Sequence, residues 1–499
     1  MIKSRKFRIA LMTGGAALGV ALTLAACGGA DGVASPGEGI LVGGGSSSSS
    51  SSSTPGNGTP ATACPAGLLD GGLVANNTLR ACQLPNLITG DLVLNKVAGA
   101  VYSINGRVQV GDDLGANPAA PLAGSKGTLT IAPGVKIFGS AGLDYLIISR
   151  GSQIFASGTA AEPIIFTSKQ GIEGTAGANA IGQWGGLVIA GRAPTNVCPS
   201  GVTPPNVACS EGQVEGTNAF YGGNTANDNS GILKYVRVQH SGFEVLPAKE
   251  LNGITFAGVG SGTTVEYVQV HNSSDDGMEM FGGTVNLKHI ILTGNDDDSL
   301  DTDNGYSGAL QFLIIKQRDN GGDRLFEMSS AGNAALISTP KIANATIIRR
   351  SSVASMGIEL NSGTDLAMVN SVIHNTSSTS AFGINMIAAA TASAAPSFNS
   401  VYMSGFASPF GSFSSTAALN NTVNTASIFN AGSNVTSAGT STLADFVNGA
   451  NEAAVTPVTG TALTSVSATF STTTYIGAVK DANDNWWKGW SCGLDSNPC

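Results

Sequence analysis

Short runs of alternating apolar and polar residues dominate the chain from about residue 91 onward. Five such runs occupy residues 129–131, 135–138, 145–148, 153–156 and 164–167, and turns rich in Gly, Asn or Asp separate them. Alternation with a period of two is typical of strands that bury one face, and these turn residues favour tight reversals. The pattern predicts an all-β domain of many short strands.

The spacing of the strands is regular in the middle of the chain. Five segments align by their second residues, which are Tyr235, Tyr267, His289, Phe312 and Thr346 and follow one another at steps of 32, 22, 23 and 34. Steps of 22 to 23 fit one coil of a parallel β-helix, and longer steps fit a coil with an inserted loop. We therefore predict a right-handed parallel β-helix, a pectate-lyase-like solenoid, rather than a sandwich or a propeller.

The beginning of the chain is typical of an export signal. Lys3, Arg5, Lys6 and Arg8 precede an apolar stretch over residues 9–26. The stretch is short for a membrane helix and contains three glycines. It ends in Leu24-Ala25-Ala26-Cys27, which resembles the bacterial lipobox, where the signal peptidase cuts before the cysteine and the thiol receives a lipid. This resemblance implies lipidation of Cys27, and the following Gly28-Gly29 favours the outer membrane.

A low-complexity segment follows the predicted anchor. Residues 27–60 include three consecutive glycines, eight consecutive serines and three prolines. Such a stretch buries no apolar surface and behaves as a flexible coil with a reach of roughly 30 Å. We expect a tether over 27–60, an N-terminal cap over 61–90 and the β-helix over 91–499. No later segment is long and apolar enough to span a bilayer, so the lipid would be the only anchor.

The cysteine pattern fits an oxidising compartment. Beyond Cys27 the chain has Cys64, Cys82, Cys198, Cys209, Cys492 and Cys499, which form three local pairs separated by 18, 11 and 7 residues. An even number of cysteines in an exported chain favours disulfides, and local pairing is the best of the 15 connectivities. The lack of a Cys-x-x-Cys spacing argues against a zinc or redox site.

Composition narrows the class of function. Charged residues are 11% of the chain, Gly is 67 of 499 residues and the net charge is −9. An acidic chain is repelled by phosphates, so we expect no nucleic-acid partner. Low charge with 42% hydrophobic residues also excludes a disordered chain.

Several segments resemble one family. They are residues 182–189 (GQWGGLVI), 228–237 (DNSGILKYVR), 258–268 (GVGSGTTVEYV), 294–298 (GNDDD), 475–479 (YIGAV) and 486–493 (WWKGWSCG). They are similar to secreted β-helix proteins of bacteria with outer membranes, which are often lipoproteins. The resemblance covers residues 90–499. It implies the fold and brings no established activity.

Acidic residues concentrate in one block. Residues 266–304 contain Glu266, Asp275, Asp276, Glu279, Asp296, Asp297, Asp298, Asp301 and Asp303, with Lys288 as the only Lys or Arg. Superimposing the coils places Asp275-Asp276 over Asp297-Asp298, with carboxylates about 4.8 Å apart. Oxygen ligands at this density suit Ca²⁺. We predict Asp275, Asp276, Asp296, Asp297 and Asp298 as calcium ligands; as turn-capping residues they would need no ion.

A second acidic pattern lies in the strands that follow these turns. Met278-Glu279-Met280 aligns with Leu300-Asp301-Thr302 and Ile358-Glu359-Leu360, and Phe326 occupies the intervening coil. Alternation directs the three acids outward. Polysaccharide hydrolases of this fold use paired carboxylates as acid and base. The catalytic candidates are Asp275, Asp276, Glu279, Asp301 and Glu359. Ser274-Asp275-Asp276-Gly277 loosely resembles the Asp pair of pectin-hydrolysing β-helices, whose other motifs are missing, and the lyase-base candidates Lys316, Arg318 and Arg324 carry no motif.

The remaining candidates favour structure over chemistry. His240 and His271 end equivalent strands one residue out of register, as expected for hydrogen-bonded turn residues. Trp486, Trp487 and Trp490 lie beside Cys492 and Cys499, and we expect a cap over the last coil rather than a sugar-stacking platform.

Together these patterns predict a lipoprotein exposed on the outer membrane. Its β-helix would be a calcium-stabilised binding or adhesion module for a glycan or an outer-membrane protein. Two other functions remain open: a carbohydrate-active enzyme, either a polysaccharide lyase or a glycoside hydrolase, at the acidic face, and an accessory lipoprotein of an uptake system.

Overall fold

The computed structural model describes residues 58–499, apart from 248, 354–355, 380, 388–390, 392–393, 412–424 and 495–498. The predicted export signal, Cys27 and nearly all of the predicted tether lie outside the described residues. None of the helices in the described part is long and apolar enough to cross a bilayer.

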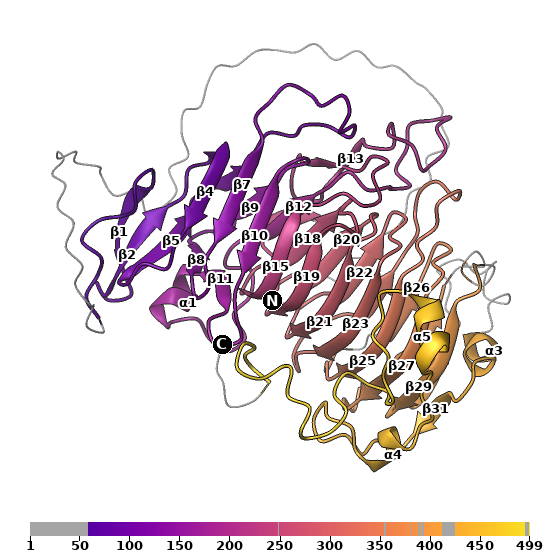
Figure 1. The fold of residues 1–499 in the computed structure, drawn as a ribbon. Coiled ribbons are helices and arrows are strands. Elements are labelled where there is room, and N and C mark those ends of the chain that lie inside the picture. Colours follow the sequence, from indigo (N-terminus) through magenta and orange to yellow (C-terminus); the bar gives the residue numbers. More distant parts are fainter. Residues whose placement is uncertain are drawn as a thin grey trace, which may run out of the picture. The chain divides into compact units, whose positions relative to one another are not determined.

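Parallel strands form two long sheets. Sheet A contains, in spatial order, β1 (Leu69–Val74), β2 (Leu79–Gln83), β5 (Ala100–Ile104), β8 (Lys136–Gly139), β11 (Ile164–Ser168), β15 (Gly231–Gln239), β19 (Thr264–His271), β21 (Asn286–Thr293), β23 (Ala309–Lys316), β25 (Lys341–Arg349), β27 (Ala367–Asn375), β29 (Ser397–Ser404) and β31 (Thr436–Gly439). A branch of this sheet, made of β4 (Gly90–Leu94), β7 (Gly127–Ile131) and β10 (Gln153–Ser157), joins it at β15. Sheet B contains β3 (Leu87–Ile88), β6 (Arg107–Val110), β9 (Tyr145–Ile148), β12 (Gly186–Ala190), β18 (Ile254–Ala257), β20 (Met278–Phe281), β22 (Leu300–Asp303), β24 (Phe326–Met328), β26 (Met356–Leu360), β28 (Phe382–Met386) and β30 (Ser408–Gly411). Successive coils contribute neighbouring strands to both sheets (Figure 1), so the predicted right-handed parallel β-helix is confirmed.

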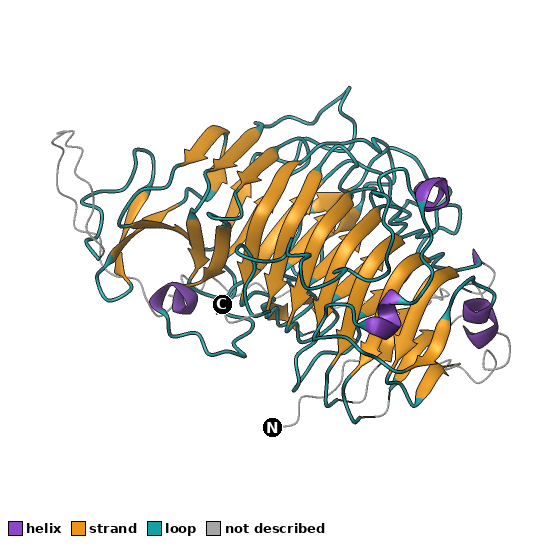
Figure 2. Ribbon diagram, turned by 60° about the horizontal axis from the view of Figure 1, so that its bottom comes forward, coloured by secondary structure: helices purple, strands orange, loops and turns teal. Residues whose placement is uncertain are grey.

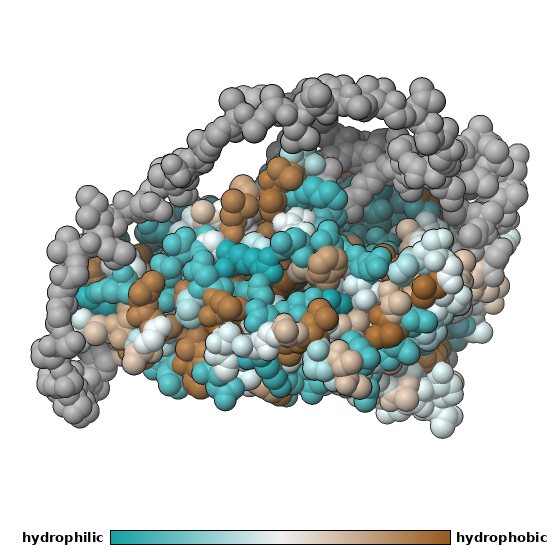
Figure 3. Space-filling model, turned by 90° about the horizontal axis from the view of Figure 1, so that it is seen from above, coloured by the Kyte–Doolittle hydropathy of each residue, from teal (hydrophilic) through white to brown (hydrophobic). Residues whose placement is uncertain are grey.

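Small elements decorate the coil stack. Outside the two long sheets, antiparallel hairpins pair β13 (Gly212–Gln213) with β14 (Phe220–Tyr221) and β16 (Glu244–Leu246) with β17 (Lys249–Glu250). The described residues also form the short helices α1 (Lys169–Glu173), α3 (Thr425–Asn430), α4 (Ala450–Ala453) and α5 (Gly460–Val466). Figure 2 shows these helices at the periphery of the strands. On the face seen from above, apolar residues are interspersed with hydrophilic ones (Figure 3).

A backbone bend joins two strand tracks of sheet A into one. In the early coils the tracks are separate, because β10 pairs with the first half of β15 and β11 pairs with the second half. Tyr235 lies between the two halves with a φ of 51°. This left-handed residue turns the chain while the pairing continues on both sides. From β15 onward each coil therefore contributes one long, bent strand.

The predicted alignment of the coils is confirmed for four positions and wrong for the fifth. Tyr235, Tyr267, His289 and Phe312 have φ values of 51°, 56°, 57° and 61°, and they stack with ring centroids 4.5, 4.3 and 4.8 Å apart. The next coil places Asn344, with a φ of 52°, beside Phe312. Thr346, which we expected there, lies two residues further along the strand. Asn adopts the left-handed conformation more readily than a β-branched residue.

The inward side chains form continuous apolar ladders. One ladder runs through Val238, Val270, Leu292, Ile315 and Ile347, which pair in register and are fully buried. Each added coil thus extends the same hydrophobic core.

Both ends of the stack differ from the expected caps. β2 already pairs in parallel with β5, so the coils begin near Leu79 rather than at residue 91. At the other end Phe429 of α3 packs against Phe398 and Phe410, with ring centroids 5.3 Å apart in both contacts. The helix therefore covers the described end of the core, where we expected the C-terminal tryptophans.

The C-terminal segment instead runs back along the outer face of sheet A. We call residues 440–494 the C-terminal strap, which Figure 1 shows in yellow beneath the strands. Trp487 and Trp490 pack with Ile291, Ile314 and Ile348, whose side chains face outward from the coils. The predicted end cap is therefore wrong: the tryptophans close the side of the helix and not its end.

The three predicted disulfides are present. They join Cys64 to Cys82, Cys198 to Cys209 and Cys492 to Cys499. Each pair is local in sequence, so the bridges secure the first coil, an inserted loop and the strap end.

Candidate metal centre

Sheet B carries a ladder of carboxylates on its outward side. The strand register pairs Glu279 of β20 with Asp301 of β22, then with Glu327 of β24 and Glu359 of β26. The predicted alignment of Glu279, Asp301 and Glu359 is thus confirmed. Phe326 occupies the intervening coil as expected, and it packs inward beside the acid that follows it. We call these four residues the acidic ladder.

The acidic ladder faces away from the core, and three of its four residues are nonetheless shielded from solvent, whereas Glu327 is partly exposed. The exposed fractions are 2% for Glu279, 2% for Asp301 and 5% for Glu359. The hairpin β13–β14 covers this side, since Tyr221 packs on Phe281 with ring centroids 5.8 Å apart and accepts a hydrogen bond of 3.0 Å from Asn304. A polymer therefore has little access to these carboxylates.

The turns before the ladder strands contribute a second layer of acids. Asp276 Oδ1 accepts the backbone N–H of Asp298 at 3.1 Å, and Asp298 Oδ1 accepts that of Arg324 at 2.6 Å. Each aspartate thus caps the turn of the next coil, as expected for turn residues. Asp275, Asp276 and Asp298 are buried, so capping alone leaves charged groups in a poorly solvated place.

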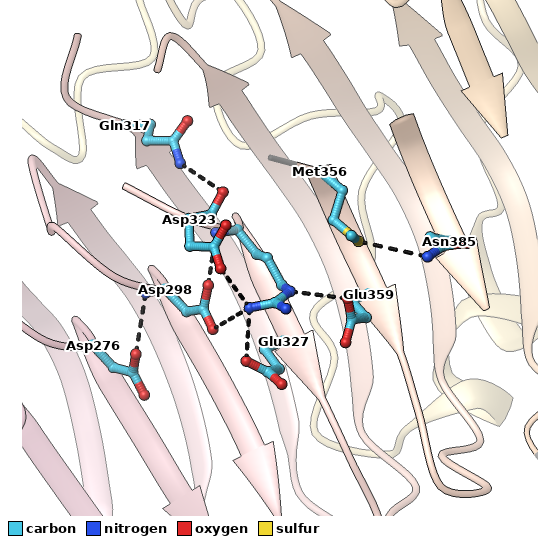
Figure 4. A network of polar contacts seen from close by, with 9 residues as sticks. Asp276, Asp298, Gln317, Asp323, Glu327, Met356, Glu359 and Asn385 are labelled. Atoms are coloured by element: carbon cyan, nitrogen blue, oxygen red, sulfur yellow. Dashed lines mark hydrogen bonds and ion pairs between the residues drawn. The ribbon is translucent and has the colours of Figure 1, made fainter. Parts of the chain in front are cut away.

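Arg324 neutralises one end of this region, where the carboxylates of Asp298, Asp323, Glu327 and Glu359 converge (Figure 4). Its guanidinium lies 2.8 Å from Asp323, 3.0 Å from Glu327, 3.0 Å from Glu359 and 3.6 Å from Asp298. Burial alone would lower the pKa of Arg324, but these carboxylates raise it above its ordinary value. No ion pair joins Arg324 to Asp301 in the described part of the chain.

Among the described residues, four groups of three acids have carboxylate oxygens within 4.8 Å of one another. They are Asp275–Asp276–Asp297, Asp276–Glu279–Asp301, Asp297–Asp298–Asp323 and Asp298–Asp301–Glu327. Ca²⁺ binds oxygens at 2.3–2.6 Å, so oxygens this close can reach one ion. The groups share members, which makes them one continuous acidic region.

Asp301 is the most isolated acid of this region. Its Oδ1 is buried and has no hydrogen-bond partner among the described residues. Burial raises the pKa of Asp301 well above its ordinary value, and the charges of Asp303, Glu279, Asp276 and Glu327 raise it further. The pKa of Asp298 is also raised by burial and by neighbouring acids, although Arg324 opposes that shift. Arg324 already supplies a positive charge to Asp298, whereas a proton or a cation would stabilise Asp301.

The structure brings most of the predicted site residues together and places one of them elsewhere. It brings Asp275, Asp276, Asp297 and Asp298 into the acidic region, together with Glu279 and Asp301. Asp296 instead pairs with Arg318 at 3.2 Å. Three contributors were missed as part of this region: Glu327 as a ladder member, Asp323 as a turn acid and Arg324 as their counter-charge. Glu327 follows Phe326 directly, so the alternation that placed Phe326 inward could have placed Glu327 in the ladder.

The histidines stay outside this region. His271 pairs with Gln239, so His240 lies one residue beyond its equivalent, as predicted. His240 Nδ1 is 2.8 Å from the carbonyl oxygen of Ala180, and His271 Nδ1 is 2.8 Å from Thr293 Oγ1. These contacts fit hydrogen-bonded strand-end residues.

The chain belongs to a recognised family. The family described as pectate-lyase like beta helix domain matches residues 118–491, which is about three quarters of the chain. Comparison with curated proteins and with solved structures finds no match.

Proposed function

We propose that the chain is a calcium-stabilised β-helix that binds a carbohydrate at the bacterial cell surface. Membership of the pectate-lyase-like family supports a carbohydrate-related role. The lipobox-like residues before Cys27 support anchoring in the outer membrane. The buried carboxylate of Asp301 is the observation that supports the calcium.

The ion would bind among Asp276, Glu279 and Asp301. Carboxylate oxygens of these three acids lie within 4.8 Å of one another, whereas Arg324 pairs with Asp298, Glu327 and Glu359. A divalent cation there would give Asp301 Oδ1 a partner and offset the repulsion that raises its pKa. Asn252 donates to Glu279 Oε2 at 2.6 Å and would fix that carboxylate as a ligand.

Burial of the ladder supports a stabilising role for the acids over a catalytic one. A general acid must reach the glycosidic oxygen of its substrate, and both hydrolysis mechanisms need two carboxyl groups beside the bond. Glu279, Asp301 and Glu359 are at most 5% exposed. The raised pKa values of Asp301 and Glu359 would suit a general acid, so polysaccharide cleavage is the second candidate.

Calcium should raise the melting temperature of the full chain. A hundredfold excess of Ca²⁺ over its dissociation constant should stabilise the fold by ~2.7 kcal/mol. Asp301→Asn should abolish this response and stabilise the calcium-free protein, because it removes one repelling charge. Asp144→Asn is the matched control: Asp144 accepts backbone N–H groups of Gly106, Ser140 and Ala141 in a distant turn. It should lower the melting temperature and keep the calcium response.

Three results would decide between the possibilities. Loss of the response in Asp275→Asn but not in Asp301→Asn would place the ion in the turns. A melting curve unmoved by millimolar Ca²⁺ would reject the calcium site. Depolymerisation of a polysaccharide by the wild type, abolished in Asp301→Asn, would identify an enzyme instead.

A further inference from the structure

The first coil ends in open strand edges. Sheet B begins at β3, and among the described residues β4 pairs with β7 alone. The opposite end of the coil stack differs, because Phe429 of α3 packs over it. A strand edge with open backbone groups is a template on which another chain can pair.

The hydrogen bonds of β4 identify the backbone groups at its open edge. Gly90 donates its N–H to the carbonyl oxygen of Lys126, just before β7, and Leu94 accepts from the residue just after β7. Successive residues of a strand direct their N–H and C=O groups to opposite sides. The backbone groups of Asp91 and Val93 therefore point away from β7, to the open side.

Exposed apolar side chains gather on the edge strands at this end. Of the described residues, nine have large apolar side chains that are exposed, and four of these lie on β1, β3 and β4: Leu69, Leu73, Leu87 and Val93. The edge of β1 is interrupted, because its register shifts after Asp70. The pairing of β4 has no such shift and its sequence has no proline, so two common devices against edge pairing are missing there.

The charge at this end lets a second copy approach. Residues 58–99 contain two acids, Asp70 and Asp91, and two cations, Arg80 and Lys96, so this part has no net charge. The whole chain has a net charge of −9. Two copies therefore repel each other less at this end than over the rest of their surface.

The open edge of β4 is complementary to itself. A second β4 that runs antiparallel and is centred on Leu92 places Asp91 of each copy opposite Val93 of the other. Both pairs then exchange their N–H and C=O hydrogen bonds, and the two-fold axis closes the assembly at two copies. A head-to-tail array would instead need the end of the stack that α3 covers.

We propose that β4 pairs with β4 of a second copy, which gives an antiparallel two-fold dimer joined at the first coils. The contact involves one short strand edge, so the dimer is weak and reversible. Its residues are separate from the acidic region of sheet B. Loss of dimerisation and loss of the calcium response can therefore be told apart.

Sedimentation equilibrium of the full chain tests the dimer. From micromolar to millimolar concentration, the mass should rise from that of one copy toward that of two. A wild type that stays monomeric throughout, as it would if another segment of the chain occupied the edge, would overturn the proposal. Growth beyond two copies would also overturn it, because a two-fold contact cannot continue.

Substitutions at Val93 locate the contact. Val93→Pro removes an N–H that points away from β7, so it should weaken the dimer about tenfold or more and leave the melting temperature nearly unchanged. Val93→Lys should weaken it through charge. Leu69→Lys is the matched control, because Leu69 is exposed on the interrupted edge of β1, and it should leave dimerisation unchanged. Dimers of wild-type strength in both Val93 variants would reject the assignment.

Disulfide trapping tests the register. Leu92→Cys should form a disulfide between two copies in oxidised glutathione, because pairing centred on this residue brings its two Cα atoms about 4.5 Å apart. Asp91→Cys should cross-link poorly, since its two copies lie diagonally, about 7–8 Å apart. The wild type gives the background from its native cysteines. Equal yields at the two positions would reject pairing centred on Leu92.

Discussion

A left-handed backbone conformation recurs at one position of successive coils. The residues there are Tyr235, Tyr267, His289, Phe312, Asn344, Asn370 and Ser400. The first four could be predicted from the spacing of aromatic and histidine residues. Asn344 could not, because alternation has a period of two and a slip of two residues keeps every side chain on its face. Its amide donates to the carbonyl oxygen of Tyr475, a contact between segments far apart in sequence.

His289 should make the fold sensitive to acid. Its ring stacks between Tyr267 and Phe312, and burial, followed by the charges of Lys288 and Lys234, lowers the pKa of His289 to about 3. The ordinary pKa of the unfolded chain is 6.5, so the native state binds fewer protons between these values. Stability from this residue is therefore lost as the pH falls from 6.5 toward 3.

The variant His289→Phe should retain the stack and lose this sensitivity. Its melting temperature should fall less than that of the wild type between pH 7 and pH 4.5, measured by differential scanning calorimetry. The raised pKa of Asp301 acts with the opposite sign, because its native carboxyl retains a proton that the unfolded chain releases. Both proteins share Asp301, so the difference isolates His289. Parallel losses on acidification would show that His289 does not titrate with folding.

At the scale of elements, the acidic ladder shows what alternation and period can establish. From the sequence alone, these two patterns place Glu279, Asp301 and Glu359 at equivalent positions of their strands. They say nothing of Arg324, whose role depends on four carboxylates supplied by three coils. Neither pattern predicts the burial of the ladder, because Tyr221, which covers this side of the sheet, belongs to an insertion between coils.

The strap should contribute strongly to stability through Trp490. This side chain is fully buried and packs edge-on against Tyr235 and Tyr267, with ring centroids 5.9 and 6.0 Å away. Trp490→Ala should destabilise the protein by about 3–5 kcal/mol, as for other large buried aromatics. Trp486→Ala is the matched control with a smaller expected loss, since Trp486 is only partly buried.

Denaturant unfolding of the two variants measures the difference. A cooperative transition that moves to lower denaturant in Trp490→Ala would show that the strap unfolds with the coils. If the strap detaches alone, limited proteolysis of Trp490→Ala would remove the C-terminus and the main transition would stay in place. That outcome would show that the strap does not unfold together with the coils.

At the scale of the whole molecule, the coil stack was predictable and the path of the chain around it was not. A repeated apolar pattern determines that coils stack, because every inward ladder must continue into the next coil. An apolar C-terminal segment can bury its side chains either over the end of the coil stack or along its side. The outward isoleucines at 291, 314 and 348 favour the side, but in the sequence they look like ordinary strand residues.

If Cys27 is lipidated as predicted, the lipid should hold the molecule at the membrane. Cys27, which lies outside the described residues, ends the stretch Leu24-Ala25-Ala26-Cys27 after a basic and apolar beginning. Stable anchoring by lipid needs more than one acyl chain, at about 0.8 kcal/mol per buried methylene, and the diacylglycerol of a lipoprotein supplies two. Cys27→Ser should therefore release the protein from the membrane fraction or leave it unprocessed, as measured by fractionation and intact mass. Cys198→Ser, which breaks a disulfide of the folded part, should remain membrane-bound. A Cys27→Ser protein that is still processed and membrane-bound would show that another element anchors it.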